Sequence, residues 1–303
     1  MKKKSLVPKY WIPVFLGPFV LFYAVFHLFP ILNSFYVSFT DWDGLIPTSK
    51  NFIGLRNYGK VFQDPLFYRA LFNTLRIMVF QVPLVIITGL LIAVLLNSTS
   101  HGRRLVQTLN FLPYITTPVA IGFIFAFLFD WNIGPVNAIL RFFHIISANV
   151  NWLGSSTWAP AITVLLSVWR YFGYFMVLYL AGLAAVPQEL YEAAVVDGAS
   201  PVQNFFYITL PMVRPITVFV IINSMIGSFQ LFDEPNLLFE GSMNGVVGGP
   251  GRSVLTIMWY FYDIAFRSTF RYGYGAALAF SLCLIIAFIS ILNVKILNRK
   301  EDT

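Results

Sequence analysis

Long apolar runs separated by short polar segments dominate the pattern of this chain. A helix needs about 20 mostly apolar residues to cross a membrane, and the chain contains six runs of that kind. Their approximate bounds are residues 14–35, 72–96, 105–129, 159–183, 216–238 and 274–297. Pro113 and Pro118 fall inside the third run and predict a kink there. The pattern predicts an all-α polytopic membrane protein with six transmembrane helices, forming one domain over residues 1–303.

Composition agrees with a membrane protein and adds its orientation. Hydrophobic residues make up 58% of the chain and charged residues 11%, whereas soluble domains have roughly 25% charged residues. The net charge of +7 bears on orientation and does not indicate nucleic acid as a partner, because basic residues collect at the cytoplasmic ends of spans. The basic residues that crowd span ends are Lys2, Lys3, Lys4, Lys9, Arg103, Arg104, Arg214, Lys295, Arg299 and Lys300. They predict that both termini are cytoplasmic and that the first span is retained as an uncleaved anchor.

Candidate chemistry is sparse. Cys283 is the single cysteine and the three histidines are far apart, so we expect no disulfide framework and no metal site. The chain has no phosphate-binding glycine loop and no recognisable hydrolase motif. A membrane-embedded enzyme is therefore disfavoured, and transport is the better interpretation. A self-contained secondary transporter or channel is the alternative, but it predicts inverted repeats and coupling carboxylates at mid-depth, and no repeat is visible.

Polar residues inside the apolar runs suggest a pathway. In the fifth run, Asn223, Gly227, Gln230 and Glu234 recur at positions i, i+4, i+7 and i+11, which predicts one polar helical face. In the fourth run, Thr163, Ser167, Arg170 and Tyr174 have the same spacing. Such faces either bond neighbouring helices together or line a route for a polar solute. We expect the first role for most single residues and the second for the fifth-run face as a whole.

The residue types indicate what such a route would carry. Amides bond hydroxyl groups and aromatic faces stack on sugar rings, which suits a neutral polyhydroxylated ligand. The candidates are Tyr171, Tyr174, Asn223, Gly227, Phe229 and Gln230, with Asn110, Gln81 and Tyr114 as further polar residues within spans. Arg170 near mid-depth, Asp233 and Glu234 are further candidates for the route; alternatively, Arg170 pairs with Asp233 or Glu234.

The segment from Val186 to Pro215 predicts a helical hairpin between the fourth and fifth runs. Pro187 suits the first position of a helix, and Gly198 suits its end. Ser200 then caps a second helix, with Gln203 in the capping-box position. The hairpin carries more acidic than basic residues, which excludes a DNA-reading helix-turn-helix. We interpret it as a docking element for another protein.

The same segment resembles the cytoplasmic loop of bacterial ABC importer permeases. That family's pattern is matched in residue type and spacing by Glu192-Ala193-Ala194, Gly198, Ile208 and Leu210-Pro211. Other stretches resemble the carbohydrate-uptake branch of the maltose and glycerol-3-phosphate type: Phe39-Thr40-Asp41-Trp42, residues 52–58, Ile133-Gly134-Pro135-Val136-Asn137 and Gly248-Gly249-Pro250. The resemblance covers nearly the whole chain.

The resemblance implies a permease subunit in the bacterial cytoplasmic membrane that imports a carbohydrate by alternating access. Its implied partners are a second homologous permease, two cytoplasmic ATPase subunits that bind the ATP and Mg²⁺, an external solute-binding protein and the lipid bilayer. The chain itself would hold no cofactor. The residues implied to couple it to an ATPase are Glu192, Ala193, Ala194, Asp197, Gly198, Ile208, Leu210 and Pro211. Small alanines would admit the partner closely, Glu192 would pair with a basic group, and Leu210-Pro211 would end the second helix.

Overall fold

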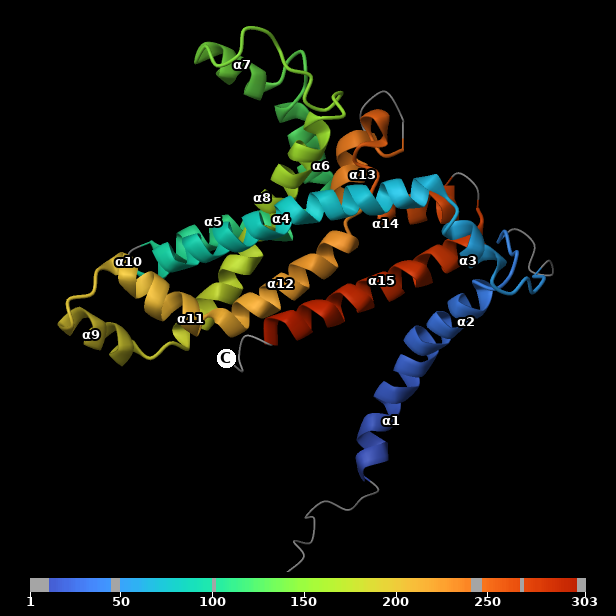
Figure 1. Ribbon diagram of the computed structural model, residues 1–303, viewed down its shortest axis with the longest axis horizontal. Coiled ribbons are helices and arrows are strands. Elements are labelled where there is room, and N and C mark those ends of the chain that lie inside the picture. The colour runs from blue at the N-terminus through green and yellow to red at the C-terminus, as the bar shows by residue number, and fades with distance from the viewer. Residues whose placement is uncertain (1–10, 45–49, 100–101, 241–246, 268–269, 299–303) are drawn as a thin grey trace, which may run out of the picture. The chain divides into compact units, whose positions relative to one another are not determined.

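The computed structural model describes residues 11–44, 50–99, 102–240, 247–267 and 270–298. Within them the regular structure is helical, apart from one isolated antiparallel bridge between Thr40 and Phe52. Figure 1 shows the helices in chain order by colour. The chain divides into two compact units. One contains Met1–Asp64 and Phe261–Leu284, and the other contains Pro65–Tyr260 and Ile285–Thr303. The all-helical membrane fold predicted from the apolar runs is confirmed.

The first unit contains the amino-terminal helices and part of the last one. Its elements are α1 (Trp11–Tyr23), a π-helical turn η1 (Ala24–Leu28), α2 (Phe29–Val37), α3 (Arg56–Val61) and a second π-helical turn η4 (Asp263–Arg267). The end of α14 (Ile257–Tyr262) and the first half of α15 (Tyr272–Asn298) also belong to it. From Val14 to Val37 the apolar side chains are mostly exposed, as suits a helix surrounded by lipid.

Two of the stretches that resemble the carbohydrate branch meet in this first unit. The Thr40–Phe52 bridge brings residues 39–42 beside residues 51–53. Asn57 is buried and its amide donates to the carbonyls of Ser38 and Thr40, at 3.0 and 2.8 Å. The side-chain amide and the backbone N–H of Asn51 both donate to Asp41, which lowers the pKa of that exposed carboxyl. These motif residues therefore build a hydrogen-bonded turn after α2.

The second unit contains the remaining helices. They are α4 (Pro65–Asn97), α5 (Arg103–Ile115), α6 (Pro118–Leu128), α7 (Pro135–Phe142), α8 (Trp158–Ala184), α9 (Gln188–Val196), α10 (Pro201–Asn204), η2 (Phe205–Thr209), α11 (Leu210–Met212), α12 (Arg214–Phe229), α13 (Asp233–Glu240) and the 3₁₀ turn η3 (Pro250–Arg252). Its core joins α4, α8 and α12 through buried residues such as Val85, Met176 and Val220. This core places the polar residues of three helices close together.

Two glycines let helices approach α8 closely. Gly89 on α4 has its Cβ position 3.2 Å from the Cβ of Phe175, so a side chain there would press on α8. Gly173 on α8 faces the backbone of Asn110 and Phe111 on α5, and a Cβ at that position would overlap the Asn110 carbonyl. Small residues at helix crossings are typical of membrane bundles because they allow backbones to touch.

Among the residues that the structure describes, four helices are long and apolar enough to cross a membrane, and the number rises to six if each of two bent pairs is one span. The four are Val14–Val37, Pro65–Asn97, Trp158–Ala184 and Tyr272–Ile291. The predicted third span is broken into two helices, α5 and α6, which meet at 96°, a far larger bend than the predicted kink. Pro113 lies inside α5, and the break falls just before Pro118, where Thr116 and Thr117 are extended.

The prediction of one continuous fifth helix over residues 216–238 is wrong. α12 ends at Phe229, and α13 begins at Asp233 after a break. Gln230 at the break has φ −90° and ψ 4°, outside the helical range, and its N–H is bonded to the carbonyls of Ile226 and Gly227. Apolar periodicity missed the break because Leu231 and Phe232 continue the apolar run without a glycine or proline between them.

Asparagines also fasten the long segments of the second unit. Asn137 on α7 is buried; its amide donates to the Val150 carbonyl and its oxygen accepts from the Trp152 indole. Asn73 on α4 donates to the carbonyls of Arg252 and Leu255, at 2.9 and 3.1 Å. Of the other two stretches of the carbohydrate-branch resemblance, residues 133–137 lead into α7 and form its start, and residues 248–250 lead into η3.

Candidate functional site

The hairpin between α8 and α12 begins with α9. Pro187 is the residue before the helix, in an extended conformation, so the prediction that it occupies the first helical position is off by one. At the other end Gly198 has φ +80°, the left-handed conformation that glycine adopts at low cost. The N–H groups of Gly198 and Ala199 bond to the carbonyls of Val195 and Ala194, which forms a Schellman motif. Gly198 thus ends the helix as predicted.

The second arm of the hairpin starts at the predicted cap. The Gln203 N–H donates to the Ser200 hydroxyl at 3.3 Å, and the Ser200 N–H donates to the Gln203 side chain at 2.7 Å. The arm continues through α10, the π-helical turn η2 and α11, and it ends at Met212, one residue beyond the predicted end at Pro211. The hydroxyls of Tyr191 and Thr209 lie 3.0 Å apart and tie the two arms together.

Large apolar side chains lie on the outer surface of this hairpin. Val196 is 86% exposed and Tyr207 is 79% exposed. Glu192 is exposed, and within the described part of the chain its carboxylate has neither a hydrogen bond nor an ion pair. Between the arms lies a hollow of about 270 Å³, lined by Ala194, Asp197, Gly198, Ala199, Gln203, Asn204, Tyr207 and Ile208. An exposed apolar surface rimmed by polar groups is typical of protein docking.

A second candidate site is a small pocket lined by polar and aromatic side chains among four helices of the second unit. Its volume is about 120 Å³, and four helices contribute to it. The lining residues are Gln81 from α4, Tyr114 from α5, Tyr171, Tyr174 and Phe175 from α8, and Asn223, Ser224 and Gly227 from α12. The pocket thus combines two amides, a serine and an aromatic wall.

The aromatic wall is formed by tyrosines of two helices. Tyr114 stacks on Tyr174 with ring centroids 4.7 Å apart and an interplanar angle of 17°. Tyr171 meets Tyr114 edge-on at 6.0 Å. Gln81, which also lines the pocket, is buried and accepts a hydrogen bond from the Ser228 hydroxyl at 3.4 Å.

An ion pair joins α8 to α13 close to this pocket. Arg170 Nη1 lies 2.5 Å from Glu234 Oε1, and both side chains are largely buried, with exposed fractions of 11% and 3%. The Arg170 guanidinium also lies 5.3 Å from the Tyr171 ring centroid. Of the two acidic residues expected as partners for Arg170, Glu234 forms the ion pair, whereas Asp233 is exposed. The arginine charge is therefore neutralised within the protein.

Comparisons with known proteins define the family. Residues 85–301 match the model of the binding-protein-dependent transport system inner membrane component. This chain belongs to that family. The permease is 35% identical over 281 residues to the lactose transport system permease protein LacF of Rhizobium radiobacter. The match covers 92% of this chain and 91% of LacF. It is also 35% identical to the arabinooligosaccharides transport system permease protein AraP of Bacillus subtilis (strain 168), over 93% of this chain and 87% of AraP.

Solved structures agree on the fold. A chain in the crystal structure of a bacterial ABC transporter that imports the acidic polysaccharide alginate superposes with a TM-score of 0.77. The two chains are 22% identical, and the match covers 96% of each. Membership of this family makes the permease a multi-pass component of an inner membrane transport system and assigns it no catalytic role.

The permease brings together only some of the residues predicted for the pathway. Tyr171, Tyr174, Asn223 and Gly227 line the pocket, as do Gln81 and Tyr114. The single face predicted for the fifth span does not exist, because the helix breaks at Gln230 and places Glu234 on another helix.

Six predicted pathway residues do not line the pocket. Arg170 and Glu234 form the ion pair described above, and the other four lie outside the pocket for separate reasons. Phe229 is buried in packing, while Gln230 and Asp233 are exposed at the break. Asn110 bonds its own helix at Val106. Sequence reasoning missed Phe175 and Ser224, which follow Tyr174 and Asn223 in the chain and also line the pocket.

Proposed function

We propose that this permease carries a neutral carbohydrate across the cytoplasmic membrane as one half of an ATP-driven importer. The support comes first from its relatives, whose names refer to lactose and arabinooligosaccharides. It comes also from the pocket, where amides and tyrosine rings are the groups that bind hydroxyls and stack on sugar rings. The Arg170–Glu234 pair leaves no net charge beside the pocket, which favours an uncharged ligand.

The pocket is one part of the route. Its volume of about 120 Å³ is smaller than the roughly 300–1,000 Å³ of usual ligand sites. A second, homologous permease across the pathway would supply the remaining wall, and an external solute-binding protein would deliver the sugar. In this arrangement both termini and the hairpin face the cytoplasm, and the other ends of α4 and α8 face outwards.

The hairpin is the proposed contact with a cytoplasmic ATPase subunit. Ala193 is exposed and small, so a partner surface can approach the backbone of α9. Glu192 offers an unpaired carboxylate to a basic group, and Val196 offers apolar area. Because α9 follows α8 directly and α11 leads into α12, movement of the ATPase would be transmitted to two of the helices that line the pocket.

Co-purification tests the assembly. The permease, extracted gently from its native membrane, is expected to bring down nucleotide-binding subunits in a fixed ratio. Glu192→Ala is expected to reduce transport and sugar-stimulated ATP hydrolysis without reducing the amount of permease in the membrane. Glu189→Ala is the matched control, since Glu189 is an exposed carboxylate of the same helix outside the spaced motif. Equal effects of the two substitutions would contradict a specific docking role.

Sugar dependence tests the pocket. A panel of mono- and oligosaccharides, each with the binding protein, would be screened for stimulation of ATPase activity in the complete complex. Asn223→Leu is expected to lower transport of the preferred sugar about tenfold, the effect of roughly 1.4 kcal/mol. Gln230→Leu serves as the control because Gln230 is exposed at the break and does not line the pocket. If Gln230→Leu has the larger effect, the pocket is not on the sugar's route.

A further inference from the structure

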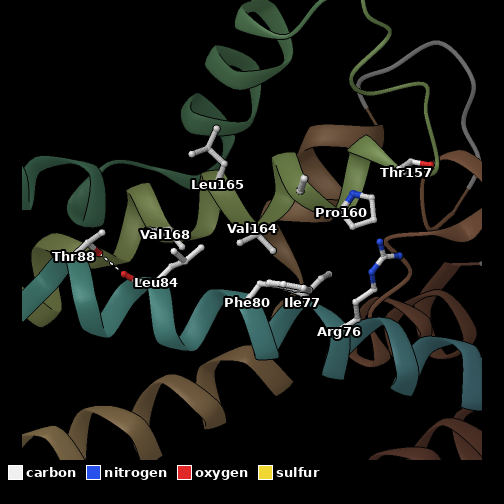
Figure 2. A pocket seen from close by; sticks show the side chains of 11 residues that line it. Arg76, Ile77, Phe80, Leu84, Thr88, Thr157, Pro160, Val164, Leu165 and Val168 are labelled. Carbon is white, nitrogen blue, oxygen red and sulfur yellow. Dashed lines mark hydrogen bonds between the residues drawn. The ribbon is translucent and has the colours of Figure 1, made fainter.

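A mainly apolar groove runs between α4 and α8, separate from the polar pocket (Figure 2). Its volume is about 580 Å³, and eight of its eleven lining residues are apolar: Ile77, Phe80, Leu84, Pro160, Ala161, Val164, Leu165 and Val168. Thr88 at one end donates its hydroxyl to the Leu84 carbonyl at 2.6 Å and so requires no other acceptor. Phe80, Leu84 and Leu165 are between 44% and 59% exposed. The groove is therefore open and suits an apolar occupant.

The groove has the depth of one membrane leaflet. Arg76 immediately precedes an uncharged run of 20 residues, Ile77–Leu96, which as a helix is about 30 Å long and matches the hydrocarbon core. Arg76 thus lies at the hydrocarbon boundary, and Trp158 begins α8 at the same end of the groove, as interfacial tryptophans do. From Arg76 to Thr88 the helix rises about 18 Å, slightly more than half the core thickness of about 30 Å.

Arg76 provides a cation at the mouth of this groove. In Figure 2 its guanidinium points towards Pro160 and Thr157 at the start of α8. Arg76 is exposed and makes no hydrogen bond or ion pair with any residue that the structure describes. Arg69, two turns earlier on α4, differs because its guanidinium donates to the Gly251 carbonyl. The start of α8 adds the positive end of a helix dipole, without a capping side chain to occupy it.

We propose that an anionic glycerophospholipid binds here, with one acyl chain in the groove and its phosphate on Arg76. Guanidinium groups bind phosphate oxygens in pairs of charge-assisted hydrogen bonds. An anionic headgroup is preferred over a zwitterionic one because none of the described residues that line the groove has a carboxylate to receive an ammonium group. The lipid belongs to the leaflet at the end of α8 away from the hairpin, which is the outer leaflet in the proposed orientation. Its binding does not depend on which solute the permease carries.

Lipid retention by the complete transporter tests this site. The complex would be purified, exchanged into nanodiscs of phosphatidylglycerol and phosphatidylcholine, and examined by native mass spectrometry for phosphatidylglycerol that resists removal. The wild-type complex is expected to retain one phosphatidylglycerol. In Arg76→Gln, the fraction of complexes that retain this lipid is expected to fall at least fivefold. Arg76→Lys should restore part of the binding because it keeps the charge. Ala161→Phe should also displace the lipid, since it fills the groove from α8.

Two matched variants control for general effects. Arg69→Gln removes a cation from the same helix, and Val79→Phe adds bulk at an exposed α4 position outside the groove; both are expected to keep the lipid. Equal phosphatidylglycerol retention by wild type and Arg76→Gln overturns the proposal. A photoreactive residue at Leu165 distinguishes the occupants directly: capture of phospholipid supports the proposal, and capture of the second permease shows that protein fills the groove instead. None of these measurements requires transport, so failure of the lipid site and failure of the proposed function are separable.

Discussion

The hairpin between α8 and α12 and the interior around α8 satisfy their polar groups in opposite ways. In the hairpin the bonds are local, as between Ser200 and Gln203, three residues apart, and Glu192 is left exposed to solvent. In the interior Arg170 reaches Glu234 across 64 residues of sequence, and both are largely buried. The first arrangement leaves a surface that a partner can use, whereas the second fastens helices to one another.

Two glycines repeat this contrast. Gly198 in the hairpin has φ +80°, but a Cβ added there would meet nothing within 4 Å. Gly173 on α8 has an ordinary helical backbone, but a Cβ there would overlap the backbone of α5. One glycine is required for its conformation and the other for its lack of volume. Substitutions that separate these two requirements sharpen the comparison.

The largest effect is expected from breaking the interior ion pair. Glu234→Leu leaves the Arg170 charge buried without its partner, which typically costs about 3–5 kcal/mol. The expected result is a markedly lower thermal unfolding midpoint of the purified complex. The double variant Arg170→Met/Glu234→Leu should recover most of the loss, because replacing both charges with apolar groups is often close to neutral.

Asp233 provides the matched control for this pair. It is adjacent to Glu234 but exposed, so Asp233→Asn is expected to change stability by no more than about 0.5 kcal/mol. A double variant that is as unstable as Glu234→Leu alone would mean that Arg170 and Glu234 do not act as a pair.

The hairpin could be predicted almost residue by residue because its signals are local. Pro187, Gly198 and Ser200 each act on the backbone within one turn, and the structure moves the predicted ends by only one residue. The all-helical fold was equally accessible from apolar runs of about 20 residues. From the sequence, the partner of Arg170 could be limited to Asp233 or Glu234. Which of the two forms the ion pair depends on the rotation of α13 after the break, and the sequence does not determine that rotation.

The second-largest effect is expected at the α5–α8 crossing. Gly173→Ala places a methyl group against the Asn110 carbonyl, and overpacking of this kind typically costs about 1–3 kcal/mol. Backbone cannot rotate away as a side chain can, so α5 and α8 must separate. The expected result is a lower unfolding midpoint together with altered exposure of Tyr114, measurable by its reactivity in the assembled complex.

Gly227 shows whether this cost belongs to the crossing or to any helical glycine. It lies inside α12, and a Cβ there meets nothing within 4 Å. Gly227→Ala is therefore expected to be neutral or stabilising by about 0.4–1 kcal/mol. If both substitutions destabilise equally, the close contact between α5 and α8 is not what requires Gly173.

The interior escaped prediction for a physical reason. Hydrophobic periodicity indicates which side chains are shielded from water. Inside a membrane, lipid and neighbouring helices both provide that shielding, so the pattern does not distinguish between them. Leu231 and Phe232 therefore continue the apolar run across the break after α12. The Asn223–Gly227 part of the predicted face survives because it lies wholly within α12, while Gln230 and Glu234 lie beyond its end.

The smallest effect on folding, with a distinct effect on activity, is expected at Gly198. The left-handed conformation costs a residue other than glycine roughly 1–2 kcal/mol of conformational free energy. Gly198→Val should therefore loosen the end of α9 without disturbing the interior. Gly198→Asn should cost less because asparagine tolerates this conformation. We expect normal amounts of permease in the membrane, about tenfold less sugar-stimulated ATP hydrolysis with valine, and a clearly milder loss with asparagine. Since no atoms surround the Cβ position, equal losses with both residues would mean that side-chain bulk at the partner surface, and not backbone conformation, is what Gly198 avoids.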